Sequence, residues 1–217
     1  MKILITSGAT REPLDDVRFL SNVSTGATGA ALADALVVHG HQVSLLRGTG
    51  AVAARRARDA GEFGSTADLL ARLRARVASG KFDAVIQCAA VADYTPARVT
   101  RGKMSSYAPS LTVRLVPTPK ILPQIKSFAA AHPPVVIGFK LTSGADATAR
   151  ATAVAKLFAA GTVDAVIHND LADLATGRAR PFRAYIAGRA RPEKLAGLPA
   201  LAEWLASFLK VARASCP

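Results

Sequence analysis

The chain has 217 residues, half of them hydrophobic, and carries a formal net charge of +13. This length and apolar content predict a folded chain with a sizeable core and exclude a largely disordered protein. No apolar stretch is long enough to cross a bilayer and no cleavable signal segment is seen, so we expect a cytoplasmic protein with no membrane partner. The two cysteines, Cys88 and Cys216, lie far apart in the sequence, so we expect no disulfide framework.

Short β-rich runs alternate with helical runs along the chain. The first half should contain a strand at 2–6, a helix at about 25–39 that Thr25 caps and Gly40 stops, a strand at 42–46, a helix at 65–80 and a strand at 83–91. The second half should contain a strand at 133–139, a helix at about 146–160, strands at 164–169 and 183–187, and a final helix at 198–213. Continuous apolar strands separated by helices are typical of a parallel sheet covered on both faces. The sequence therefore predicts one α/β domain over residues 1–217, with a doubly wound, mostly parallel Rossmann-like sheet and helices on both faces.

One segment, residues 94–116, interrupts this alternation. It has no helical period, it is punctuated by proline and glycine, and its end, "LTVRLV", alternates like a two-sided strand. Such a long excursion between a strand and a helix is usually a functional arm or lid, and a plain surface loop is the alternative. Because the alternating strand cannot bury both faces in a sheet already covered by helices, we expect it to pair across a homodimer.

The candidate ligand-binding residues follow the strands, because ligands of doubly wound sheets bind beyond the carboxyl ends of the strands. Gly8 follows the first strand, and Asp93 is the main acid after "QCAAVAD". The basic and amide side chains that follow or flank these ends are Arg18, Asn22, Lys103, Lys120, Lys140, Lys156 and Asn169. Together they favour a site for phosphate groups, although any single lysine is more simply a solvated surface residue. Nucleic acid is the least favoured partner of the positive charge, since no dense basic run with interleaved aromatic residues occurs.

Other chemistries are less well supported by the sequence. An NADP-dependent oxidoreductase on the same fold is the alternative, but the insertion of residues 11–24 separates the two glycine clusters that a dinucleotide fingerprint keeps together. The four histidines do not have the spacing of metal ligands, so the sequence does not identify the metal-binding residues, although the carboxylate of Asp93 is available for a hydroxyl or a metal. Cys88 lies in an apolar strand and is expected in the core.

Several motifs, in a fixed order and spacing, give the sequence a resemblance to a known family. They are "TSGATREPLDDVRFLSNVSTGATGAALA", "AAVADYTP", "GKMSS", "LVPTPKIL", "VIGFKL" and "DAVIHND". The chain resembles the phosphopantothenoylcysteine synthetases, the phosphopantothenate–cysteine ligases of coenzyme A biosynthesis, from residue 2 to about residue 209. The resemblance implies a ligase that joins 4'-phosphopantothenate to cysteine through an acyl-nucleotide intermediate, at the expense of CTP or ATP.

The resemblance also implies roles for individual residues. Asn22 and Lys103 are the implied catalytic residues. The implied substrate-binding residues are Gly8, Arg18, Asn22, Ala89, Ala90 and Asp93. The implied nucleotide-binding residues are Gly8, Asp93, Lys103, Pro119, Lys120, Ile121, Leu122, Phe139, Lys140 and Lys156. The resemblance further implies a dimer in which a loop of one subunit completes the substrate site of the other. Arg18 would then act at the site of the neighbouring subunit.

Two further expectations come from comparing this chain with the family pattern. The family reaction implies Mg²⁺ or a similar divalent cation with the nucleotide, and a separate decarboxylase as a possible partner. No FMN is expected, because nothing precedes Met1 and 217 residues hold only the ligase. The bacterial K-x-K-K motif is "KMSS" here and a lysine is lost at Ala27, so "KMSS" with "GFKL" is more similar to the branch that uses ATP.

Overall fold

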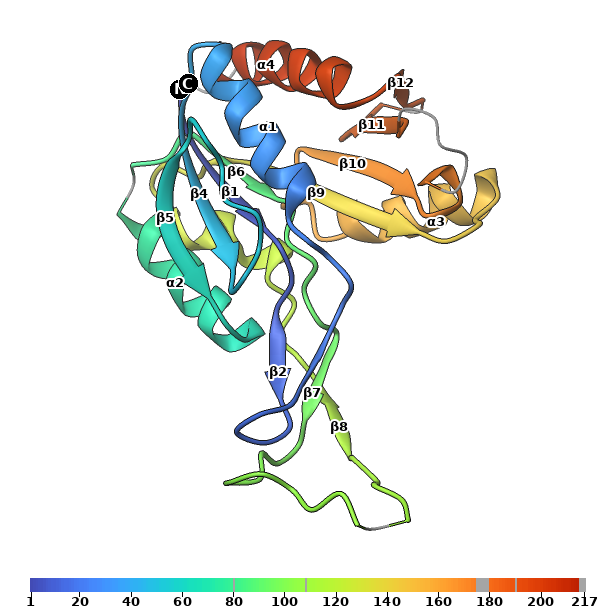
Figure 1. Cartoon of the computed structure of the whole chain (residues 1–217). Coiled ribbons are helices and arrows are strands. Elements are labelled where there is room, and N and C mark those ends of the chain that lie inside the picture. The colour runs from blue at the N-terminus through green and yellow to red at the C-terminus, as the bar shows by residue number, and fades with distance from the viewer. Residues whose placement is uncertain (80, 108, 175–179, 190, 215–217) are drawn as a thin grey trace.

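The computed structural model describes residues 1–79, 81–107, 109–174, 180–189 and 191–214, so Cys216 lies outside the described residues. Its largest element is an eight-stranded sheet (Figure 1). From one edge to the other, the strands are β12 (Glu193–Leu195), β11 (Phe182–Ile186), β10 (Ala165–Asp170), β9 (Val135–Thr142), β6 (Ala84–Gln87), β1 (Lys2–Ser7), β4 (Gln42–Gly48) and β5 (Arg58–Phe63). Within these ranges, no helix has the length and apolar character needed to cross a membrane.

The strands from β5 to β10 run parallel, whereas β11 and β12 are antiparallel to their neighbours. Numbered along the chain, the parallel strands follow the order 3-2-1-4-5-6 of doubly wound nucleotide-binding folds, which confirms the predicted fold class. Two strands of this sheet, β5 and β12, are not predicted by the sequence. The polar sequence of β5, RDAGEF, suits an edge strand with one paired side. The predicted closing strand, β11, is antiparallel to β10, which agrees with a mostly parallel sheet.

Helices cover both faces of the sheet. They are α1 (Ala27–Val38), α2 (Thr66–Ala78), α3 (Ala147–Phe158) and α4 (Leu198–Ala214), with short 3-10 helices at Leu122–Gln124, Lys126–Ala129 and Ala172–Leu174. In Figure 1, α1 and α4 lie together on one face of the sheet, and α2 lies on the other. Side chains of β1 alternate accordingly, because Ile3 and Ile5 pack with α1 and α4 while Leu4 packs with α2.

Helix α1 begins one residue later than the sequence predicts. Its N-cap is Gly26, with a φ of 78°, rather than Thr25. The Thr25 hydroxyl oxygen still accepts a hydrogen bond from the amide of Ala27 at 3.3 Å. At the other end Gly40, with a φ of 83°, follows the C-cap residue and stops the helix as predicted.

Two hairpins project from the carboxyl edge of the sheet, and Figure 1 shows both extending away from it. In the first hairpin, β2 (Arg11–Pro13) pairs with β3 (Phe19–Ser21). In the second, which we call the arm, β7 (Tyr94–Pro96) pairs with β8 (Leu115–Pro117). The alternating run "LTVRLV" is therefore a strand only at its end, and that strand pairs within its own chain. The expectation that it needs a strand from another copy is corrected, because β7 already supplies its backbone partners.

Candidate functional site

The candidate site lies at the carboxyl edge of the sheet, where β1 and β6 are neighbours. Beyond the two strands, Ala9 and Ala90 form a further parallel bridge. The amide of Ala90 donates to the carbonyl of Gly8 at 2.8 Å, and the amide of Thr10 donates to the carbonyl of Ala90 at 3.2 Å. The strand order reverses here, and such switch points are where doubly wound sheets bind ligands. The structure thus brings the predicted residues Gly8, Ala89 and Ala90 together.

Close packing requires glycine at two positions beside this point. Gly8 has a φ of 79°, and a Cβ there would lie 2.6 Å from the Cβ of Ala51. Gly26 has a φ of 78°, and its Cβ would lie 3.1 Å from the backbone nitrogen of Gly8. The two glycines let the end of β1, the loop after β4 and the start of α1 meet. Their consequence for function is that the positive end of the α1 dipole lies at the switch point.

Buried polar contacts, which the sequence reasoning missed, hold the base of the first hairpin. The hydroxyl oxygen of Thr10 accepts a hydrogen bond from the amide of Ala92 at 2.9 Å. Glu12 is 3% exposed and accepts hydrogen bonds from the amide (2.8 Å) and the hydroxyl (2.7 Å) of Thr66. Thr66 is the first residue of α2, whose dipole stabilises a carboxylate at this end. These contacts fix the hairpin to both the arm and α2.

Asn22 and Asp93 lie at the bases of the two hairpins. The amide nitrogen Nδ2 of Asn22 donates to the carbonyl of Val91 at 3.1 Å. Asp93 forms an ion pair with Lys120 across the base of the arm. All three polar side chains are exposed. An amide, a carboxylate and an ammonium group therefore reach solvent beside the same switch point.

The predicted nucleotide segment, residues 119–122, divides into an exposed and a buried half. Pro119 and Lys120 are exposed, whereas Ile121 is 3% exposed and belongs to the core. Leu122 covers Gly138, where a Cβ would lie 2.7 Å from its Cδ2. A ligand can therefore meet the side chains of the first two residues, while Ile121 is restricted to backbone contacts. On β9, the half-buried residues Phe139 and Lys140 point to opposite faces of the sheet.

The structure does not bring every predicted residue to this point. Helix α3 begins just after β9, so its first turn is the one near the carboxyl edge of the sheet. Lys156 lies in the last turn of α3, which places it roughly 14 Å further along the helix axis at a rise of about 1.5 Å per residue. Arg18 lies elsewhere, at the tip of the first hairpin, where it contacts the arm beside Lys103. The Nη2 group of Arg18 donates to the carbonyl of Met104 at 3.2 Å, next to the exposed Lys103.

Asp15 organises that tip, and the sequence reasoning missed it. Its carboxylate accepts hydrogen bonds from the amides of Met104 (3.0 Å), Val17 (2.9 Å) and Arg18 (2.7 Å). The hydrogen bond from Met104, supported by the other two, lowers the pKa of Asp15 against the effect of burial. An ionised carboxylate at this position therefore ties the arm to the first hairpin at neutral pH.

A second carboxylate fixes the ends of β9 and β10. Asp170 is 4% exposed, and its Oδ2 accepts a hydrogen bond from the hydroxyl of Thr142 at 2.5 Å. This bond, together with bonds from three backbone amides in the following loops, holds the pKa of Asp170 well below its ordinary value. The Thr142 hydroxyl also lies 2.8 Å from Nε2 of the fully buried His168, whose pKa burial lowers. The network orders the loop into α3.

Nothing in the described part of the chain supplies a metal centre or a reactive thiol. No group of three or more histidine, cysteine or acidic residues there is arranged to hold a metal ion. Burial raises the pKa of the Cys88 thiol to about 12, so this thiol is protonated at neutral pH and is a poor nucleophile. Cys88 borders the core rather than lying within it, because it is half-buried and packs against the α1 side of the core.

These features define a Rossmann-type α/β domain whose candidate site lies at the carboxyl edge of the sheet, beside two hairpins. Residues 1–185 match the sequence model of a family described as the DNA/pantothenate metabolism flavoprotein C-terminal domain. The chain belongs to this family.

Known proteins of similar sequence and structure agree with this membership. The chain is 32% identical over 185 residues to the coenzyme A biosynthesis bifunctional protein CoaBC of Escherichia coli strain K12, an alignment that covers 82% of the chain and 43% of the relative. It spans about two fifths of the length of the curated relatives it matches.

Among solved structures, the DNA/pantothenate metabolism flavoprotein from Streptococcus pneumoniae is similar with a TM-score of 0.85 and 25% identity, covering 98% of this chain and 99% of that one. A Cab2 mutant in complex with phosphopantothenate-cysteine is similar with a TM-score of 0.77 and 17% identity, covering 99% and 89% of the two chains. At that identity the likeness shows the shared fold.

Proposed function

We propose that this domain is a phosphopantothenate–cysteine ligase, which joins 4'-phosphopantothenate to cysteine in coenzyme A biosynthesis. The observation that carries the proposal is that the family match, residues 1–185, includes the whole carboxyl edge with both hairpins. The CoaBC relative is named for coenzyme A biosynthesis, and the Cab2 structure holds phosphopantothenate-cysteine. Family membership does not favour the oxidoreductase alternative. A cytoplasmic location stays a prediction from the sequence.

The proposed reaction has two steps. The carboxylate of 4'-phosphopantothenate attacks the α-phosphate of the nucleoside triphosphate, and pyrophosphate leaves. The amine of cysteine then attacks the acyl carbon, and the nucleoside monophosphate leaves. Asn22 donates an amide N–H to the oxyanion that develops at the acyl carbon, and Lys120 and Lys103 offset the charge of the phosphates. Lys103 reaches the nucleotide by a movement of the arm.

The residues at this edge suit a divalent cation that arrives with the nucleotide. Asp93 is the exposed carboxylate beside the switch point, and Lys120 already neutralises part of its charge. Mg²⁺ keeps several waters and takes one or two carboxylates plus substrate phosphates as ligands, so Asp93 alone is sufficient from the protein side. When bound, the cation supplies charge compensation at the phosphates.

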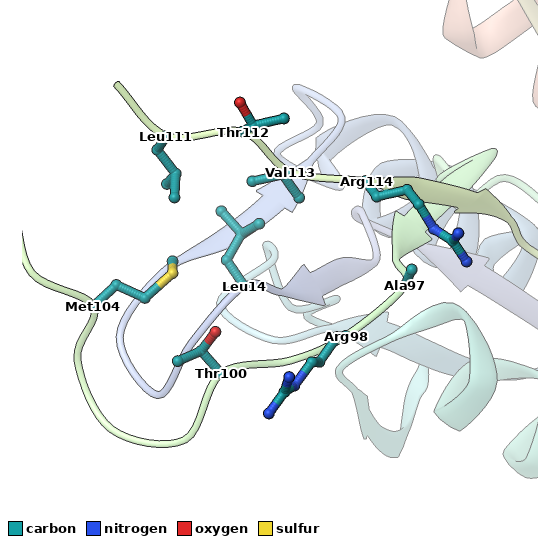
Figure 2. A pocket seen from close by; sticks show the side chains of 9 residues that line it. All are labelled: Leu14, Ala97, Arg98, Thr100, Met104, Leu111, Thr112, Val113 and Arg114. Atoms are coloured by element: carbon teal, nitrogen blue, oxygen red, sulfur yellow. The ribbon is translucent and has the colours of Figure 1, made fainter. Parts of the chain in front are cut away.

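A homodimer formed through the hairpins is the second part of the proposal. Large apolar side chains are exposed mainly on the first hairpin and the arm, namely Val17, Phe19, Leu20, Val23, Tyr94, Val99, Tyr107, Leu111 and Leu115. Soluble monomers rarely expose so many apolar side chains together, and such patches are typical of interfaces. A pocket of about 420 Å³ adds to this surface, and Figure 2 shows Leu14 of the first hairpin pointing into it beside Met104 and Leu111 of the arm.

We expect light scattering to give about twice the chain mass of 22.5 kDa. Leu111→Asp should shift the protein towards the monomer, because it places a charge in the apolar interface. Val38→Asp is the matched control, since Val38 is exposed on α1, away from both hairpins. A wild-type protein that remains a monomer at assay concentrations would contradict the proposed dimer.

We expect ATP to support turnover at least as well as CTP, because "KMSS" and "GFKL" resemble the ATP-using branch. The test is pyrophosphate release in the presence of 4'-phosphopantothenate, cysteine and each nucleotide in turn, with the product identified by mass spectrometry. Reactions that omit cysteine or 4'-phosphopantothenate are the controls. A strong preference for CTP would reverse the nucleotide assignment, and no product with either nucleotide would refute the ligase.

A further inference from the structure

Arg180 lies at the same carboxyl edge, and neither its sequence position nor the family motifs point to it. It stands between β10 and β11 and contacts two elements that are far apart in the sequence. With the Asn169 amide oriented so that its oxygen faces the guanidinium, Nε (3.2 Å) and Nη2 of Arg180 both donate to that oxygen. Nη1 lies 3.4 Å from the hydroxyl oxygen of Thr28. These contacts place the guanidinium between the end of β10 and the first turn of α1.

This position is electrostatically unbalanced in the ligand-free protein. Thr28 is the second residue of α1, so the cation lies beside the positive end of the helix dipole, where it is repelled. No carboxylate among the described residues forms an ion pair with Arg180. Asp173, the acid that acts on it electrostatically, pairs with Arg183 at 3.4 Å. A negative ligand at this point would interact favourably with both the guanidinium and the helix end.

The guanidinium is also held in place and has donors to spare. Asn169 is 4% exposed, which makes it a fixed acceptor, and the guanidinium carbon lies 5.7 Å from the ring centroid of Phe182. The hydrogen bonds to Asn169 and Thr28 use three of the five N–H groups of a guanidinium, so two remain for a ligand. Burial lowers the pKa of Arg180, against the opposing effect of Asp173.

We propose that Arg180 binds a phosphate group of a substrate, together with the N-terminal end of α1. Arginine suits this role because its planar fork matches two phosphate oxygens. The first turn of α1 contains Ala27, where the bacterial pattern has a lysine, so Arg180 supplies from β10–β11 a positive charge that the helix start lacks. The inference rests on the proposed function. The phosphate belongs either to the nucleoside triphosphate or to 4'-phosphopantothenate.

Calorimetric titrations of the intact chain with ATP, CTP and 4'-phosphopantothenate, each added alone, test the proposal and distinguish the two sources. Arg180→Ala should weaken binding of the responsible ligand by about 10- to 100-fold, the usual effect of losing hydrogen bonds to a charged group. Weaker triphosphate binding assigns the triphosphate, and weaker 4'-phosphopantothenate binding assigns the acyl substrate. Arg72→Ala is the matched control, because it removes the same charge from an exposed position on α2.

Arg180→Gln removes the charge but keeps amide N–H donors for Asn169. Thermal melting shows whether each variant is folded, and Arg180→Gln replaces Arg180→Ala in the titrations if the alanine variant does not fold. The proposal is overturned if a folded variant binds all three ligands within about threefold of wild type, a change smaller than the loss of one hydrogen bond to a charged group. Product formation by the wild type is measured in parallel. Failure of the ligase itself is then seen as wild type without product, whatever the Arg180 variants bind.

Discussion

Asn22→Asp should reduce product formation by about a hundredfold or more, the usual effect of losing one oxyanion donor. The wild-type amide group donates an N–H, whereas a carboxylate at the same place repels the developing negative charge. Asn22 is exposed, and its side chain donates a hydrogen bond to the carbonyl of Val91 at the surface, so the fold should tolerate the change. The measurement is the rate of product formation under saturating substrates, with pyrophosphate release followed in the same samples.

Gln42→Glu is the matched control for this variant. It makes the same change from amide to carboxylate at an exposed residue, but at the first position of β4, on the opposite edge of the sheet. We expect wild-type rates from it. Unchanged product formation by Asn22→Asp, with the control also unchanged, would remove Asn22 from the catalytic residues and leave the ligase assignment to be carried by the other groups.

Deleting residues 98–110 should abolish ligation while leaving the sheet folded. The deletion removes Lys103 together with the backbone groups through which Gly102 and Met104 bond to Asp16 and Asp15 of the first hairpin. It leaves the amide of Ala97 bonded to the carbonyl of Arg114 at 2.9 Å, so the shortened arm can still close after Ala97. Product formation and the thermal melting curve are the two measurements.

Lys103→Ala is compared with the deletion, because it removes the charge and keeps the backbone contacts. We expect the point variant to retain residual activity and the deletion to retain none, since the deletion also disrupts the proposed dimer contact. A deletion variant that is folded and fully active would show that the arm is a surface loop with no part in the reaction.

The sequence alone determined the parallel α/β fold, because continuous apolar strands and periodic helices reflect burial on both faces, which is a local property of each segment. The same local signals placed Gly8 and Ala90 at the ends of strands. They did not reveal β5, whose polar sequence belongs to an edge strand, and they overestimated the run "LTVRLV", of which only Leu115 and Val116 lie in β8. An edge or hairpin strand buries little, so its sequence carries a weak pattern.

The site was predicted in part, and only the tertiary structure could supply the rest. Motifs selected Asn22 and Asp93, which do lie together at the bases of the hairpins, but they also selected Lys156, which lies at the far end of α3. Asp15 lies within the first family motif, which gave it no role, and Arg180 lies outside the motifs. Their roles depend on partners 89 residues away in one case and 152 in the other. Periodicity and motif spacing report neighbours along the chain, whereas contacts over such separations exist only once the sheet brings distant loops to one edge.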